Sequence, residues 1–259
     1  MTQEQRLDFL LPILAHEQGR PCPRPATLAE KAQCFRALCN VRPPAPADED
    51  FLRLQDAYLS QAIQEKGVTP FAALSPLAEQ MYLWRGDITT LQVDAIVNAA
   101  NAQMRGCFVP CHGCIDNAIH TFAGVQLRLA CDALMQTLGR PARTGEAFLT
   151  PAFNLPSRYV LHTVGPVVDG PLTDVHRRQL ASCYRACLSL AREQGLTSVA
   201  FCCISTGVYR FPPAEAARIA VQTVRAFCRE RPGLHVVFNV FTQTDEALYR
   251  ALLQKGDGQ

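Results

Sequence analysis

The 259-residue sequence has few charged residues and no long apolar run. Asp, Glu, Lys and Arg make up 19% of it, against roughly 25% in an average globular protein, while 48% of the residues are hydrophobic. Such a composition is the opposite of one that keeps a chain disordered. A membrane span needs about 18 apolar residues, and the N-terminal apolar stretch is short, preceded by Glu4 and Asp8 and interrupted by Pro12. We therefore expect a compact cytoplasmic protein with neither a secretory signal nor a membrane partner.

Other absences narrow the classes of function. The formal net charge is only +2, so the chain lacks the basic face that neutralises a run of phosphates, and we expect no nucleic-acid partner. A Walker-type loop is absent, as is a Gly-x-Gly-x-x-Gly motif after any expected strand, which disfavours nucleotide triphosphatases and dehydrogenases. Cysteine, by contrast, is frequent, with 12 residues. In a reducing compartment these thiols are expected to be buried hydrophobes, nucleophiles or metal ligands rather than disulfides.

The N-terminal part, residues 1–78, shows helical patterns separated by proline-rich joints and no convincing strand. Apolar side chains recur at helical spacing from Leu7 to Leu14, from Leu28 to Leu38 and from Phe51 to Ala62. By length, the chain suits one large domain or one domain with an extension. We expect residues 1–78 to be a helical extension packed on the remainder of the chain.

Apolar and β-branched runs begin after Met81. The nearly continuous runs indicate strands that are covered on both faces, and helical patterns lie between them. This alternation predicts an α/β layered domain over residues 79–259. The expected strands are 93–97, 158–164, 198–204 and 235–241, and the expected helices are 116–138, 175–194 and 214–231.

Three cysteines and one histidine fall within the segment Cys107-Phe-Val-Pro-Cys-His-Gly-Cys114. Thiolate sulfur and imidazole nitrogen are the donors that zinc prefers, and three protein ligands leave a fourth position open. We favour Cys107, His112 and Cys114 as ligands, because the adjacent Cys111 and His112 would point in different directions. The alternatives are a closed zinc site that also uses Cys111, a thiol cluster without metal, and a redox pair of Cys111 and Cys114.

Two further segments come directly after buried strands. Asn98 and Asn101 place amides at the carboxyl edge of a sheet, where they could meet sugar hydroxyls, although local capping of loops is the plainer interpretation. The segment Ile204-Ser-Thr-Gly-Val-Tyr209 joins a strand to a helix start, where backbone N–H groups could hold a diphosphate without Lys or Arg. An ordinary turn is the plainer interpretation there.

Taken in order, Gly86-Asp-Ile-Thr89, Val97-Asn-Ala-Ala-Asn101 and Ile204-Ser-Thr-Gly-Val-Tyr209 resemble the ADP-ribose-binding segments of the macrodomain family. The segment from Gly106 to His120 is similar to the signature of the zinc-dependent macrodomains of bacteria and fungi, which hydrolyse ADP-ribose from modified proteins. The resemblance covers residues 81 to about 253, and a helical extension is also similar to that subfamily. It implies a three-layer α/β/α sandwich with a mixed central sheet.

The resemblance also implies roles for single residues. Asp87 would accept from the adenine amino group beside the backbone of Ile88, Asn101 would hold the distal ribose, and Phe241 is a weaker candidate to pack on adenine. One catalytic zinc ion would be held by Cys107, His112 and Cys114 next to Asn101. Two facing loops would enclose the diphosphate and distal ribose with Ile115, Asp116, Ser205, Thr206, Gly207, Val208 and Tyr209.

The implied activity is the removal of mono-ADP-ribose from aspartate or glutamate side chains of modified proteins, with release of ADP-ribose. A non-catalytic module that binds ADP-ribose and uses zinc only to stiffen its loop is the alternative. The implied partners are ADP-ribose and mono-ADP-ribosylated protein. Some relatives act with a sirtuin-like transferase and a lipoylated carrier protein, which adds such a carrier to the partners. We expect a monomer.

Overall fold

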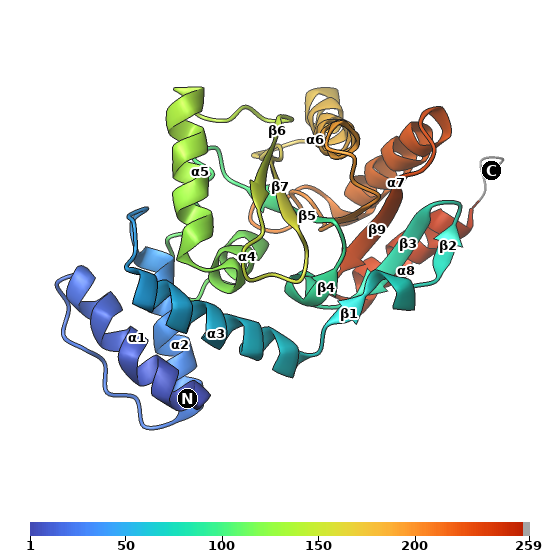
Figure 1. Cartoon of the computed structure of the whole chain (residues 1–259). Helices are drawn as coiled ribbons and strands as arrows, with labels where there is room; N and C mark the ends of the chain where they lie inside the picture. Colours follow the sequence, from blue (N-terminus) through green and yellow to red (C-terminus); the bar gives the residue numbers. More distant parts are fainter. Residues whose placement is uncertain (256–259) are drawn as a thin grey trace.

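The computed structural model describes residues 1–255 and contains a seven-stranded sheet between two layers of helices (Figure 1). Helices α4 (Ile115–Ala123) and α5 (Val125–Leu138) lie on one face. Helices α6 (Asp174–Glu193), α7 (Pro213–Glu230) and α8 (Gln243–Gln254) pack side by side on the other. This arrangement confirms the expected three-layer α/β/α sandwich. Within residues 1–255, no helix is long and apolar enough to cross a membrane.

The sheet is mixed, with strand order β2-β3-β9-β8-β5-β7-β6. Its five central strands pair in parallel, while β2 and β6 pair antiparallel at the two edges. Outside the sheet, two short strands pair with each other and two 3-10 turns lie beside them, namely β1 (Thr69–Pro70), β4 (Leu91–Gln92), η1 (Phe71–Ala73) and η2 (Ile88–Thr90). The strands of the sheet are β2 (Pro76–Ala78), β3 (Met81–Arg85), β5 (Ala95–Ala100), β6 (Ala147–Pro151), β7 (Tyr159–Val164), β8 (Ser198–Phe201) and β9 (His235–Val240).

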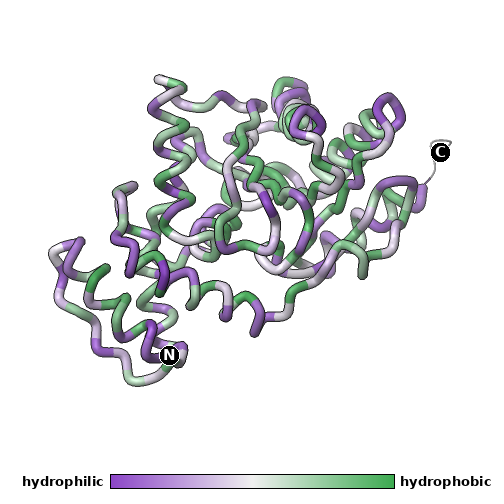
Figure 2. The backbone as a smooth tube through the Cα atoms, in the orientation of Figure 1, coloured by the Kyte–Doolittle hydropathy of each residue, from purple (hydrophilic) through white to green (hydrophobic). Residues whose placement is uncertain are grey.

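The four expected strands are confirmed as β5, β7, β8 and β9. Their apolar side chains are buried between the helix layers, and Figure 2 shows the hydrophobic residues gathered in this central part of the molecule. Strand β5 starts later than expected and runs on to Ala100, so Asn98 lies inside the strand and is fully buried. The sequence did not indicate β3 or β6.

Three helices precede the sheet: α1 (Gln3–Glu17), α2 (Leu28–Val41) and α3 (Glu49–Lys66). Thr2 and Thr27 begin the first two with capping boxes, which satisfy N–H groups at the helix starts. The expectation of no strand before residue 79 is wrong, because β2 joins the sheet as an edge strand, a position that tolerates its proline. The three helices share their own apolar core of Leu7, Leu10, Leu11, Leu14, Phe35, Leu38, Phe51, Tyr58 and Leu59.

The single helix expected over residues 116–138 is two helices, α4 and α5, which meet at Gly124. The backbone of Gly124 has φ +96° and ψ 173°, a region open almost only to glycine. A Cβ atom there would lie 2.6 Å from Gln126 Oε1 and 2.7 Å from Gln55 Nε2. The apolar stripe continues through the break, which is why helical periodicity alone did not reveal it.

We predict that Gly124→Ala lowers the free energy of unfolding by about 2–3 kcal/mol, because alanine strains this backbone and meets both amides. Gly139→Ala is the matched control. Gly139 lies in the ordinary left-handed region with no atom of the described chain within 4 Å of its Cβ position, so its cost should be about 1 kcal/mol. Urea unfolding of both variants measures the difference, and equal losses would contradict the role given to Gly124.

Candidate functional site

The segments singled out in the sequence meet along one edge of the sheet. Asp87 follows β3, Asn101 follows β5, residues 205–209 follow β8, and Phe241 follows β9. These strands run parallel through the centre of the sheet, so their carboxyl ends share an edge. Ligands of open α/β sheets bind outside that edge. The topology therefore places the nucleotide-binding candidates on one side of the molecule.

The favoured metal ligands are brought together. The ligand atoms of Cys107, His112 and Cys114 all lie within 4.8 Å of one another, and each residue is partly buried. His112 Nδ1 is buried and has no hydrogen-bond partner among residues 1–255, which is unusual for a ring nitrogen. Two thiols and an imidazole with an unpartnered nitrogen are a donor set that fits zinc.

Cys111 lies outside this group of donors. Its thiol donates to the backbone carbonyl of Gln33 at 3.6 Å, so it faces α2 rather than the other ligand atoms. The backbone of Cys111 is left-handed, with φ +53°, a conformation that residues other than glycine rarely adopt. This turn lies between the first ligand and the other two. All twelve cysteines are free thiols in this structure.

The α4 start shapes the environment of the third ligand. Cys114 is the N-cap of α4, and its sulfur accepts from Asn117 N at 3.4 Å. Burial and the neighbouring Cys107 raise the pKa of Cys114 to about 11, against the lowering effect of that hydrogen bond. Burial also raises the pKa of Tyr209, with further contributions from Asp116 and Cys114. The loop after β8 thus lies within electrostatic range of the loop from Cys107 to Cys114, which carries the three candidate ligands and is called the metal loop below.

Asp116 and two asparagines form a polar network under the site. Asn98 Nδ2 donates to Asp116 Oδ1 at 2.8 Å, and Asn101 Nδ2 donates to Asp116 Oδ2 at 3.4 Å and to the Gly106 carbonyl at 3.2 Å. Burial raises the pKa of Asp116 to about 6, although the hydrogen bond from Asn98 lowers it. Asn98 is fully buried and so supports the site from within, whereas Asn101 stays partly exposed. The network connects β5 to both ends of the metal loop.

The loop after β8 faces the loop after β7. Ser205 has φ +66° and is buried, while Gly207 and Val208 are exposed and Thr206 and Tyr209 are partly exposed. A Cβ atom on Gly165 would overlap Ser205 Oγ and lie 2.8 Å from Ile204 Cγ2, so any other residue there would displace these side chains. Val168 N donates to the Tyr209 carbonyl at 2.9 Å. The sequence reasoning missed Gly165, although a glycine directly after a buried strand was a usable signal.

The adenine candidate Asp87 is held by its own turn and by the N-terminal helices. Its Oδ1 accepts from Thr89 N at 3.0 Å, and its Oδ2 accepts from Lys66 Nζ at 2.8 Å. Burial would raise the pKa of Asp87, but hydrogen bonds from Lys66 and Thr89 outweigh it and lower the pKa. The Lys66 ammonium also lies 3.4 Å from the Phe122 ring centroid. Ile88 is buried, which leaves its backbone as the group it can offer.

Not every candidate is held in place by contacts. Phe241 is 77% exposed at the end of β9, at the same edge of the sheet as Asp87. Ile115 and Asp116 begin α4 directly after Cys114, and Asp116 lies near enough to the loop after β8 to raise the pKa of Tyr209. Sequence reasoning missed Lys66, because nothing in the spacing of α3 indicates an ion pair with a residue 21 positions later.

Comparison with known proteins agrees with this geometry. The family described as Macro domain matches residues 97–220. A protein of Treponema medium named Protein-ADP-ribose hydrolase is 52% identical over 260 residues, which cover 98% of this chain and 100% of that protein. The chain belongs to the macrodomain family.

Solved structures extend the comparison of this macrodomain. A mutant macrodomain of Oceanobacillus iheyensis with ADPR has a TM-score of 0.63 at 38% identity, covering 67% of this chain and 91% of that one. The Trypanosoma brucei macrodomain in complex with ADP-ribose has a TM-score of 0.64 at 34% identity, covering 80% and 91%. These relatives confirm the macrodomain fold.

We predict that Lys66→Gln raises the pKa of Asp87 toward the ordinary carboxyl range, because the variant removes the ammonium that stabilises the carboxylate. In the parent chain, the lowered pKa of Asp87 adds to the free energy of unfolding, and this contribution is complete at a pH above the ordinary carboxyl pKa. The contribution is lost as the pH falls through the lowered pKa of Asp87. The variant should therefore show a smaller loss of stability in acid. NMR titration of the Asp87 carboxyl carbon measures the shift.

Lys31→Gln is the matched control for this titration. Lys31 pairs with Glu4 and Asp8 within the N-terminal helices, away from Asp87. Its removal should leave the titration of Asp87 as in the parent chain. The same Asp87 curve in Lys66→Gln and in the parent would disprove the assigned cause.

Proposed function

We propose that this macrodomain hydrolyses mono-ADP-ribose from modified protein side chains, and that one zinc ion on Cys107, His112 and Cys114 is required. One observation carries the proposal: the donor cluster lies next to the edge of the sheet where β3, β5, β8 and β9 end. Asn101, the candidate for the distal ribose, bonds to the carbonyl of Gly106, the residue directly before the first ligand. The relatives named as hydrolases and the relative bound to ADP-ribose support the reaction and the ligand.

The chain's own groups would bind and orient the substrate in this proposal. Asp87 would accept from the adenine amino group, and the exposed backbone of Gly207 and Val208 would donate N–H groups to the diphosphate. Asn101 would hold the distal ribose, with its amide fixed by Asp116 and Gly106. A bound zinc ion would supply polarisation of a ribose oxygen or a water of lowered pKa.

The donor set bears on the type of linkage and the role of the metal. Two thiolates and a neutral imidazole cancel the +2 charge of zinc, which weakens it as a Lewis acid compared with a site made of histidines. A reactive linkage suits such a site, so we propose an ester on an aspartate or glutamate carboxylate as the substrate. A lipoylated carrier protein is one candidate for the modified protein. In this proposal, orientation of the ribose would be the main contribution of a metal held by Cys107, His112 and Cys114.

We predict that Cys107→Ala combined with Cys114→Ala lowers the hydrolysis rate by about a hundredfold or more, because the metal loses two of three ligands. The measurement is release of ADP-ribose from a glutamate-linked mono-ADP-ribosylated protein, with and without chelator, beside metal analysis of the purified chain. Full turnover by the double variant would refute the zinc requirement.

Cys111→Ala is the matched control, because its thiol lies in the same loop but faces α2. It should keep the metal content and most of the activity. Calorimetry with ADP-ribose separates the second candidate, a binding module with a structural zinc. Tight binding by the parent chain, with no hydrolysis of any linkage, would favour that module over the hydrolase.

A further inference from the structure

Helix α2 of the N-terminal region touches the metal loop through Arg36. The Arg36 guanidinium donates to the His112 carbonyl at 2.9 Å. It also donates twice to Asn117 Oδ1, at 2.8 and 3.1 Å. One side chain on α2 therefore holds the backbone of a metal ligand and the first turn of α4 together, across 76 to 81 positions of sequence.

Asn40, one turn further along α2, holds the strained part of the loop. Its side chain is 1% exposed, and its Oδ1 accepts from Cys111 N at 2.8 Å. Its Nδ2 donates to Thr121 Oγ1 in α4 at 3.0 Å. Cys111, with its left-handed backbone, lies directly before His112. A left-handed residue of this kind persists where its surroundings over-determine it, and Asn40 supplies that constraint.

Asn117 links Arg36 to the loop that carries the candidate ligands. Fully buried in α4, it accepts from Arg36 and donates through Nδ2 to the Val109 carbonyl at 3.0 Å. Its backbone N–H reaches Cys114 Sγ at 3.4 Å. The loop from Cys107 to Cys114 is thus held at Val109, Cys111 and His112 by groups that offer no ligand atom themselves.

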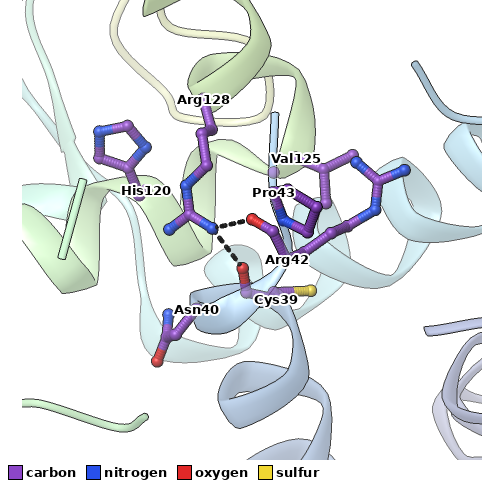
Figure 3. Close-up of a pocket in the computed structure, with 8 residues that line it drawn as sticks. Cys39, Asn40, Arg42, Pro43, His120, Val125 and Arg128 are labelled. Carbon is purple, nitrogen blue, oxygen red and sulfur yellow. Dashed lines mark hydrogen bonds between the residues drawn. The ribbon is translucent and has the colours of Figure 1, made fainter. Parts of the chain in front are cut away.

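Arg128 fixes α2 against the rest of the domain. Figure 3 shows this side chain of α5 donating to the carbonyls of Cys39 and Arg42 at the end of α2. The same guanidinium donates to the Arg105 carbonyl at 2.7 Å, two residues before the first metal ligand. The cavity in Figure 3 holds about 10 Å³, room for about one water molecule, so this junction is closely packed.

We propose that Arg36 and Asn40 are positioning residues of the metal loop, and that α2 is therefore part of the metal site rather than a separate module. The two side chains hold the turn at Cys111 and His112 in the conformation that brings the three donors together. The effect on zinc rests on the proposed function, whereas the effect on the conformation of the loop does not.

The experiment uses the full chain and the variants Arg36→Ala, Arg36→Lys and Asn40→Ala. Lys31→Ala is the matched control, since Lys31 lies on the same helix and its ion pairs to Glu4 and Asp8 stay within the N-terminal helices. It reports what a general loosening of those helices does. Thermal unfolding verifies that each variant is folded.

The first readout is hydrogen exchange of the metal-free chain. Amides of residues 106–117 should exchange about tenfold faster in Arg36→Ala and Asn40→Ala than in the parent, as expected for the loss of one net hydrogen bond, while β5 and β7 keep their protection. Lys31→Ala should leave residues 106–117 unchanged. Arg36→Lys, which can still reach one acceptor, should give an intermediate rate.

The second readout is zinc affinity, measured by competition with a chromophoric chelator. Both alanine variants should bind zinc about 10- to 100-fold more weakly, the usual cost of losing a group that orients a ligand. A parent chain that takes up no zinc would contradict the metal part of the proposed function. The hydrogen-exchange data alone would then test the positioning role of Arg36 and Asn40. Folded alanine variants with parental exchange over residues 106–117 would overturn it.

Discussion

Parallel pairing of the central strands is the constraint on which the rest of the structure depends. Strands β3, β9, β8, β5 and β7 run in one direction, so their carboxyl ends all meet at the same edge of the sheet. Segments from positions 87 to 241 of the chain thereby become neighbours. The macrodomain needs no insertion to assemble its candidate site, because the order of the strands does so.

The metal loop, by contrast, is not positioned by the order of the strands. Between β5 and α4 the chain has no regular secondary structure, so its backbone cannot be fixed by a ladder of hydrogen bonds. It is held by the Asn101 amide at one end, by the backbone N–H of Asn117 at the other, and by α2 at the strained residue Cys111. The N-terminal helices supply Lys66 to Asp87 as well. They therefore support both ends of the candidate site, which the sheet alone leaves open.

The sequence predicted the parts of this molecule that leave local signals. Strands buried on both faces appear as continuous apolar runs, and three cysteines and one histidine within eight residues stand out by spacing. The short edge strand β2 and the partly buried edge strand β6 have no such run. The apolar stripe that continues from α4 into α5 conceals the break at Gly124. The contacts of Arg36 and Asn40 join polar side chains to residues more than 70 positions away, and no local pattern encodes such pairs.

The contacts of the cations near the candidate site show how a site for an anion is compatible with the low net charge of the chain. The cations near the candidate site are bonded to the protein itself: Lys66 to Asp87, Arg36 to a carbonyl and an amide, and Arg210 to Asp169. These cations are therefore already bonded within the protein. A diphosphate at the edge of the sheet would then be held by backbone N–H groups of the loop after β8, at a helix start whose dipole favours anions. An anion site built in this way needs no basic patch, and its selectivity would depend on the geometry of the loop.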